Sequence, residues 1–323
     1  MCAASPGMRK RLGRIMTALA VLAMWSTPVS AWWDGGHMQI AAIAYTKLTP
    51  GAKAKVDALL KLNPDYQTWV GCLPADQVDK LAFVRASVWA DDIKEDPRYT
   101  DDGNSPSGAS AGQNIGYQDK LKHKYWHYMD TAFPTPGDTP TEPADPVNAL
   151  TQIELFKAAL PPSSGVSDDV RSYDLVWLLH LVGDAHQPLH SISRFSTAFP
   201  HGDRGGNTEK VRPASGEVLL LHFYWDRMFG GYTTPQGAIR DAKESGLANV
   251  PVDPALAAID DPEVWFKESF ELAKKFAYAE PVFSVTQPIE LTRDYETAAR
   301  NTSRTQAALA AQRLANMLNE AFS

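Results

Sequence analysis

The chain has 323 residues, 44% of them hydrophobic and 21% charged, and its formal net charge is −7 at pH 7. This length allows one large hydrophobic core, and no internal repeat or long low-complexity tract is present. The acidic balance is unlike the basic surface of a typical nucleic-acid-binding protein, so charge counts modestly against a nuclease unless bound cations meet the phosphates.

Residues 1–31 are typical of an export signal. Four basic residues between positions 9 and 14 precede an apolar run from Ile15 to Trp25, and a small-residue cleavage site ends at Ala31. We expect this signal peptide to be removed, leaving residues 32–323 as a secreted or periplasmic protein with a formal charge of −11, because four basic and no acidic residues are lost. No later stretch approaches the roughly 20 apolar residues of a membrane anchor.

Cysteine usage limits how the exported chain is stabilised. Cys2 lies in the signal, so Cys72 alone remains and no intramolecular disulfide can form. An exported protein without this cross-link can draw its stability from a large core or from bound metal, and the histidines described below favour metal.

Apolar spacing and breaker residues predict mostly helices, taken in chain order. The first helix covers residues 37–48 and ends at Thr49-Pro50-Gly51, and the next covers 52–62. A third, over 84–93, directs Val88 and Trp89 inward. Further helices are expected at 147–160, from Ser167 to a break near Pro188, and at 218–230, 236–246, 262–278 and 290–321. Residues 97–117 and 131–147 are predicted loops, strand signals are scarce, and we expect one mostly α domain.

Two His–Asp pairs stand at an interval of four residues. His180 precedes Asp184 in VWLLHLVGDAHQPLH, and His222 precedes Asp226 in LHFYWD. On a helix this interval places both side chains on one face, close enough to share a metal ion. The apolar run around His180 implies burial, and a buried carboxylate needs a partner. From this segment alone, a metal ion and a plain hydrogen bond between neutral histidine and aspartate are equally good interpretations.

Other candidate ligands lie beside aromatic residues. Asp91 occurs in VWADDI and His127 in YWHYMD, and His190 follows the break at Pro188, where the chain can turn back toward the same site. Singly, Asp91 and His127 would be interpreted as structural. Imidazole with carboxylate and no thiolate suits zinc.

Taken together, these segments resemble the zinc-dependent, single-strand-specific nucleases of the S1/P1 nuclease family. The resemblance runs in order through WWDGGH, WADDI, HYMD, HLVGDAHQPLH, GGN and LHFYWD to the tail QRLANMLNEAF. It implies a single-domain multi-helix bundle of the phospholipase C and zinc nuclease type, three Zn²⁺ ions, and a mature amino terminus that itself binds metal. Trp32 and His37 have the family's spacing of five, and the predicted cleavage would expose the amine of Trp32.

The resemblance also implies roles for particular residues. One zinc would bind Asp91, His127, His180 and Asp184; a second would bind Trp32, His37 and the bridging Asp184; a third would bind His190, His222 and Asp226. Asp91, Asp184 and Lys94 would take part in catalysis, and Tyr128, Asp130 and Asn207 would bind the base. His123, His186 and His201 have no ligand role and are expected at the surface or behind the ligands.

The implied reaction is hydrolysis of single-stranded DNA or RNA to 5′-phosphorylated products, together with removal of 3′ phosphates from nucleotides. The metals would activate water, so no side-chain nucleophile is needed. A monomer with no stable protein partner is expected. Two alternatives remain: a zinc-dependent phospholipase C, in which Glu replaces the final Asp of the ligand set, and a noncatalytic exported protein stabilised by zinc.

Overall fold

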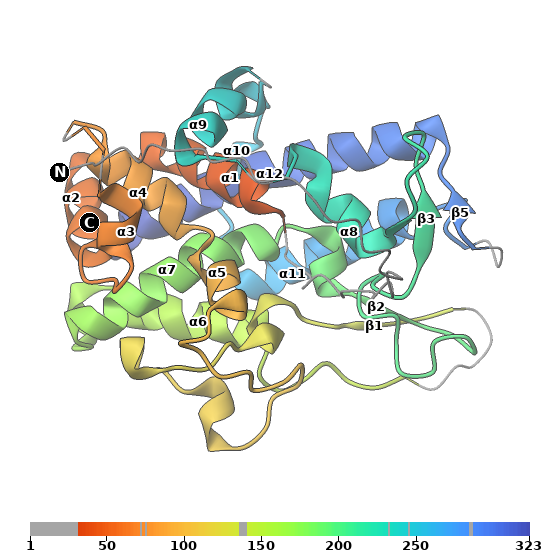
Figure 1. Ribbon diagram of the computed structural model, residues 1–323, viewed down its shortest axis with the longest axis horizontal. Helices are drawn as coiled ribbons and strands as arrows, with labels where there is room; N and C mark the ends of the chain where they lie inside the picture. The colour runs from red at the N-terminus through yellow and green to blue at the C-terminus, as the bar shows by residue number, and fades with distance from the viewer. Residues whose placement is uncertain are drawn as a thin grey trace, which may run out of the picture.

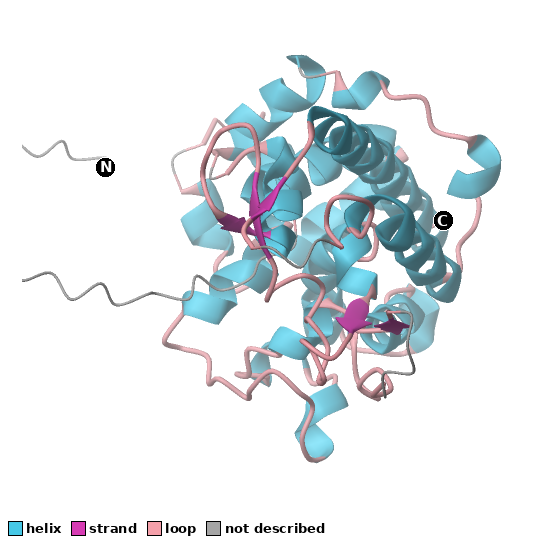
Figure 2. Ribbon diagram, turned by 90° about the vertical axis from the view of Figure 1, so that its right-hand side faces the viewer, coloured by secondary structure: helices cyan, strands magenta, loops and turns pink. Residues whose placement is uncertain are grey.

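The computed structural model describes residues 32–323 except 72, 75, 136–140, 232, 245 and 284–286. The predicted signal peptide and Cys72 lie outside these residues. Helices dominate the described chain, which confirms the mostly α prediction (Figure 2). The α-helices are α1 (Asp34–Lys47), α2 (Pro50–Leu60), α3 (Tyr66–Val70), α4 (Val78–Ala86), α5 (Trp89–Glu95), α6 (Ala149–Ala159), α7 (Asp168–Asp184), α8 (Leu221–Asp226), α9 (Pro235–Glu244), α10 (Pro254–Ala257), α11 (Pro262–Leu272) and α12 (Arg293–Ala321).

Helix α7 forms the centre of the bundle. It packs against α1, α2, α5, α6 and α12 (Figure 1), and every residue from Arg171 to Asp184 is buried. A helix that is apolar nearly all round can be stable only in such a position. The Ser167 side chain accepts a hydrogen bond from the Val170 amide at the start of α7, as the sequence predicts. At its other end, Ser269 of α11 donates to the Ala185 carbonyl over 2.6 Å.

Among the described residues, five short strands lie toward one end of the molecule, to the right in Figure 1. Strand β1 (Ala132–Pro134) pairs in parallel with β2 (Ser193–Phe195), with Ala132 opposite Ser193. Strand β3 (Lys210–Arg212) lies between β4 (Leu219–Leu220), which is antiparallel to it, and β5 (Ile289–Glu290), which is parallel to it. Strand β1 follows the motif HYMD, β2 follows HLVGDAHQPLH and β3 follows GGN, so the strand pairing fixes the segments after these three motifs.

The helix predicted at 84–93 is two helices in the structure. Helices α4 and α5 are separated by Ser87 and Val88, and the Ser87 hydroxyl donates to the Val84 carbonyl over 2.8 Å. This break leaves the Ser87 carbonyl outside the ladder of either helix, where it becomes a partner for the candidate site. Val88 and Trp89 are buried, as predicted.

Other boundaries also shift. Helix α1 ends at Lys47, one residue before the predicted end, and the Thr49 side chain caps α2 by accepting from the Ala52 amide. Helix α2 therefore begins at Pro50, two residues earlier than predicted, and Pro50 fits the first turn because it needs no amide partner there. The helix predicted at 218–230 begins only after β4, and α12 begins three residues later than predicted, because residues 289 and 290 pair with β3. Helices α3 and α10 were not predicted. The described helices include none with the length and apolarity needed to cross a membrane.

Candidate metal centre

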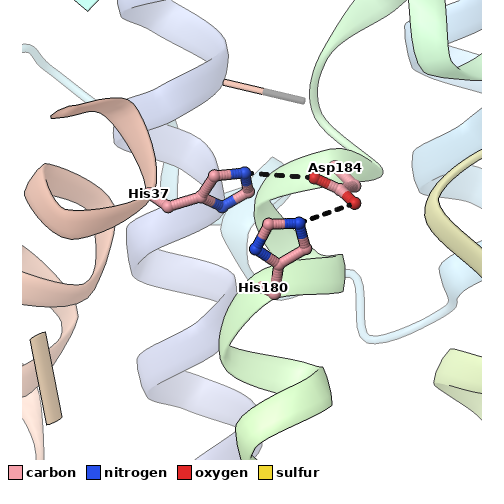
Figure 3. Close-up of side chains that lie close together, drawn as sticks. All are labelled: His37, His180 and Asp184. Carbon is pink, nitrogen blue, oxygen red and sulfur yellow. Dashed lines mark ion pairs between the residues drawn. The ribbon is translucent and has the colours of Figure 1, made fainter. Parts of the chain in front are cut away.

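Two elements distant in sequence meet at the end of α7. His180 Nε2 lies 3.3 Å from Asp184 Oδ2 on α7, and His37 of α1 brings its Nε2 within 3.2 Å of Asp184 Oδ1. Figure 3 shows each imidazole directing one nitrogen toward a different oxygen of this carboxylate, and the two rings stack with centroids 3.8 Å apart. Gly183 makes the approach possible, because a Cβ there would lie 2.8 Å from His37 Nδ1.

A second pair of candidate ligands joins the same carboxylate. His127, on a 3-10 turn (Lys124–His127), places Nδ1 within 3.1 Å of both His180 Nε2 and Asp184 Oδ2. Asp91 of α5 places Oδ1 within 3.6 Å of His180 Nε2 and 3.8 Å of His127 Nδ1. Asp184 therefore lies between two groups of side chains, as a bridging ligand would.

A third group forms where the chain turns after α7. His190, on a 3-10 turn (Pro188–Ser191), and His222 of α8 bring their Nε2 atoms within 3.1 Å of each other. Asp226 Oδ2 lies 3.3 Å from His222 Nε2, and Gln187 donates to Asp226 Oδ1 over 2.6 Å. All three residues of this group are buried, with exposed fractions of 1–3%.

Backbone carbonyls fix the tautomers of three of these histidines. The Nδ1 atoms of His180, His190 and His222 donate to the carbonyls of Ser87, His127 and Gly205, at 2.8, 2.6 and 2.8 Å. A carbonyl can only accept, so in each neutral imidazole the proton is on Nδ1 and Nε2 carries the lone pair. This is the arrangement by which partners behind a metal ligand orient it.

The resulting arrangement fits cations better than it fits hydrogen bonds. The Nε2 atoms of His190 and His222 face each other with two lone pairs, and neither can donate. His127 Nε2, Asp184 Oδ1 and Asp226 Oδ2 are buried without a hydrogen-bond partner. Within the described residues, three groups have candidate ligand atoms within 4.8 Å of one another: His37, His180 and Asp184; Asp91, His127 and His180; and His190, His222 and Asp226.

The pKa shifts describe mostly neutral imidazoles beside a charged carboxylate. His180 is the exception, because burial lowers its pKa but Asp184 and Asp91 raise it above the usual value. Burial lowers the pKa of His37 to about 4 and that of His127 to about 3, and burial together with His190 holds the pKa of His222 well below its usual value. Although burial raises it, the pKa of Asp184 is held well below its usual value by His180 and the other surrounding histidines. Unprotonated imidazole and ionised carboxylate are the forms that bind metal.

Lys94 lies beside the group formed by Asp91, His127 and His180. Its ammonium is 2.7 Å from Asp91 Oδ1, and the side chain is 5% exposed although it carries a charge. Lys94, His127 and His180 thus all approach the same oxygen of Asp91, Oδ1. Together these contacts hold the pKa of Asp91 well below its usual range, although burial opposes them.

The three predicted base-binding residues are all partly exposed. The Tyr128 hydroxyl donates to the Asn104 carbonyl over 2.7 Å, and the Asn207 side chain donates to the Arg204 carbonyl over 2.8 Å. Burial, with the nearby charges of Asp203 and Asp145, raises the pKa of Asp130 to about 7. Their role in binding stays a prediction.

Trp32 lies in the core close to Asp184. It is fully buried, its indole donates to the Gly183 carbonyl over 3.1 Å, and its ring packs edge-on against Phe229. The start of the described chain is thus fixed next to Asp184. The proposed metal binding by its backbone atoms stays a prediction.

Two of the three histidines without a ligand role are not at the surface. His201 is exposed beside Glu142, but His123 is fully buried between Asp102 and Asp119, at 2.9 Å from each. His186 is equally buried and 3.0 Å from Arg313 Nη1. Their flanking residues gave no sign of these partners, which lie up to 127 positions away.

Sequence reasoning also missed the residues that orient the ligands, namely Ser87, Gln187 and Gly205. Two of them act through their backbone carbonyls, which any residue type carries, so only the break at Ser87 and the glycine pair before Asn207 could have indicated them.

Comparisons with known proteins agree with this arrangement. A family model described as S1/P1 nuclease matches residues 32–323, a range that contains every candidate ligand. Endonuclease 2 of Arabidopsis thaliana is 27% identical over 219 residues, which are 68% of this chain and 63% of that protein. The match therefore spans less than two thirds of the length of this curated relative.

Proposed function

The chain belongs to the S1/P1 nuclease family, and we propose that it is a metal-dependent phosphodiesterase that cleaves single-stranded DNA and RNA with three bound zinc ions. The observation that carries the proposal is the convergence of three groups of imidazole and carboxylate ligands, with the lone pairs of His190 and His222 facing each other over 3.1 Å. Imidazole and carboxylate without thiolate suit zinc.

The residues that would hold each ion follow from the groups described above. Asp91, His127, His180 and Asp184 would hold one zinc, and Trp32, His37 and Asp184 its neighbour. His190, His222 and Asp226 would hold the third, and three protein ligands leave a coordination position for substrate, whereas structural zinc sites are closed by four. This count favours a catalytic over a purely structural role.

When bound, zinc supplies Lewis acidity toward the phosphate and acidifies water at neutral pH. The chain's own residues orient the ligands and exclude water from the site. Carbonyls of Ser87, His127 and Gly205 fix the ligand imidazoles, and burial of the ligands strengthens every charge interaction in the site. Lys94 neutralises part of the Asp91 charge. Its ammonium would also add to the positive charge of the zinc ions where an anionic phosphate binds.

Substrate binding would continue toward Tyr128, Asp130 and Asn207. An aromatic ring can stack on any unpaired base, which gives the sequence tolerance expected of a single-strand nuclease. Products would carry 5′ phosphates, and removal of a 3′ phosphate from a nucleotide would be the same reaction on a smaller substrate. We also propose that the protein is exported, since cleavage after Ala31 would place the free amine of Trp32 beside Asp184. We propose further that it acts as a monomer.

The deciding experiment offers single-stranded DNA, single-stranded RNA and phosphatidylcholine to zinc-loaded protein that begins at Trp32, with and without a chelator. We expect chelator-sensitive release of 5′-phosphorylated products from both nucleic acids. Turnover of the lipid alone would favour a phospholipase, and zinc binding without any turnover would favour a structural metal centre. Either result would overturn the proposed activity.

A further inference from the structure

A buried cluster of charged side chains lies outside the three metal groups. Asp203 and Glu209 are fully buried and Arg194 is 7% exposed. Arg194 belongs to β2, while the two carboxyl groups stand at the ends of the segment DRGGNTE, between β2 and β3. Nothing in the proposed chemistry uses these three side chains directly.

The cluster is closely hydrogen-bonded and screened from water. Asp203 Oδ1 accepts from the Arg194 amide over 2.8 Å, and Asp203 Oδ2 accepts from the Tyr278 hydroxyl over 2.7 Å. Glu209 Oε1 lies 2.6 Å from Arg194 Nη2. The rings of Phe199, Tyr278 and Phe283 surround the guanidinium at 5.4–5.5 Å.

Electroneutrality assigns the protons. Two ionised carboxylates beside one guanidinium would leave a net negative charge in the interior, which is strongly unfavourable. Burial, with the nearby Asp203, raises the pKa of Glu209 to about 9, so Glu209 is neutral at pH 7. The cluster is then neutral, and Arg194 joins the two ends of the intervening loop, because its amide holds Asp203 and its guanidinium holds Glu209.

That loop supports the third metal group. The Gly205 carbonyl accepts from His222 Nδ1 over 2.8 Å, and the Gly206 carbonyl accepts from the His222 amide over 3.3 Å. The Glu209 carbonyl accepts from the Leu221 amide over 2.8 Å. A Cβ on Gly205 would lie 2.2 Å from the Leu189 carbonyl, so the loop has little room to move without losing these contacts.

We propose that Asp203 and Glu209 are positioning residues: both are held by Arg194, and these contacts close the 203–209 loop and thereby hold the Gly205 carbonyl against His222. The same closure fixes the backbone that carries Asn207. As a statement about metal and substrate binding, the proposal rests on the proposed function. Its direct structural consequence, a fixed His222, does not depend on turnover.

Three substitutions test the closure. Glu209→Gln keeps the shape and the donor of the neutral acid and should behave as the unaltered protein. Glu209→Ala opens the loop. Asp203→Asn puts an amide NH₂ where either the Arg194 amide or the Tyr278 hydroxyl donates, so it should resemble Glu209→Ala despite its isosteric shape. Asp174 is another fully buried carboxyl group, and it belongs to α7 rather than to this loop, so Asp174→Ala controls for general destabilisation.

The first measurement is hydrogen exchange at the amides of Leu221 and His222 in metal-free protein. We expect at least about tenfold faster exchange in Glu209→Ala and Asp203→Asn, and rates within about twofold of the unaltered protein in Glu209→Gln. The second measurement is zinc affinity by competition. One of three zinc equivalents should weaken by about 10–100-fold in the two damaging variants, with the others unchanged.

Unchanged exchange and zinc affinity in Glu209→Ala and Asp203→Asn would overturn the proposal, as would equal damage from Glu209→Gln or from Asp174→Ala. Neither measurement uses nucleic acid. An unaltered protein that binds zinc but cleaves nothing would therefore contradict the proposed function, while the variants would still decide whether Asp203 and Glu209 position His222.

Discussion

At the scale of single residues, Asp184 and Asp226 separate the roles of the metal groups. Asp184 lies within 3.3 Å of His37, His127 and His180, whereas the candidate ligands near Asp226 are His190 and His222. We expect Asp184→Asn to lose two of three zinc equivalents and Asp226→Asn to lose one. Because hydrolysis depends on the metals, both should lower kcat/KM by at least about 100-fold.

Elemental analysis of the purified variants gives the zinc count, and hydrolysis of a single-stranded oligonucleotide gives kcat/KM. Equal zinc content in the two variants would contradict the bridging role of Asp184.

Asp174 provides a test of pH dependence away from the metals. It is fully buried, accepts one hydrogen bond from Asn114, and burial raises its pKa to about 8 from 3.8. Between these values the unfolded state has lost the proton and the folded state retains it, so this group makes stability fall as pH rises. Asp174→Asn should flatten that fall and be more stable than the unaltered protein at about pH 9.

Denaturant unfolding at about pH 5 and about pH 9 measures the effect. Asp76→Asn, at an exposed aspartate, should leave the pH dependence unchanged. A difference between Asp174→Asn and the unaltered protein that is the same at both pH values would exclude this account.

At the scale of elements, the crossing of α1 and α7 depends on Gly183. A glycine within a helix normally costs about 1 kcal/mol relative to alanine, so propensity alone predicts that Gly183→Ala is stabilising. The structure predicts the opposite, because the added Cβ would lie 2.8 Å from His37 Nδ1. We expect displacement of His37, loss of one zinc equivalent, and a lower melting temperature of the zinc-loaded protein.

Gly51→Ala in α2 is the matched control, since nothing lies within 4 Å of its added Cβ. It should keep all the zinc and be neutral or stabilised by up to about 1 kcal/mol. Full zinc content in Gly183→Ala would show that α1 and α7 adjust to the added carbon.

At the scale of the whole molecule, metal binding should stabilise the fold. Residues 32–323 contain one cysteine and so can form no intramolecular disulfide, and α1, α5, α7 and α8 all contribute candidate ligands to the three groups. An ion that binds only the folded state raises the free energy of unfolding by about 2.7 kcal/mol when its concentration is a hundred times its Kd. We expect a chelator to lower the melting temperature of the zinc-loaded protein, and added zinc to restore it. An unchanged melting temperature would show that the ions add nothing to global stability.

The proposed amino terminus at Trp32 is also a property of the whole molecule, because cleavage of the predicted signal peptide would create it. Protein beginning at Trp32 should bind one more zinc equivalent than protein with one alanine added before Trp32, since the added residue moves the free amine away from Asp184. Zinc content and oligonucleotide hydrolysis measure the difference. Identical zinc content and activity would exclude the amine as a ligand.

The sequence by itself determined the helical class, the central buried helix and the candidate ligands. Apolar spacing around His180 and Asp184 predicts a buried helix with both side chains on one face, and local periodicity contains that information. The same reasoning failed at Ser87, where the helix breaks, and at Leu219 and Leu220, which join a strand. A partner from elsewhere in the fold decides each of these positions, and no local pattern reports it.

The family resemblance already implied which candidate ligands meet, and only the tertiary structure decided what holds them there. His37 reaches Asp184 because Gly183 has no side chain, and His222 is oriented by a carbonyl in a loop closed by Asp203 and Glu209. Backbone carbonyls are the same in every residue type, and contacts between segments more than 100 positions apart follow from packing of the whole core. The residue types that bind metal are thus readable in the sequence, whereas their orientation depends on groups whose chemistry the sequence does not distinguish.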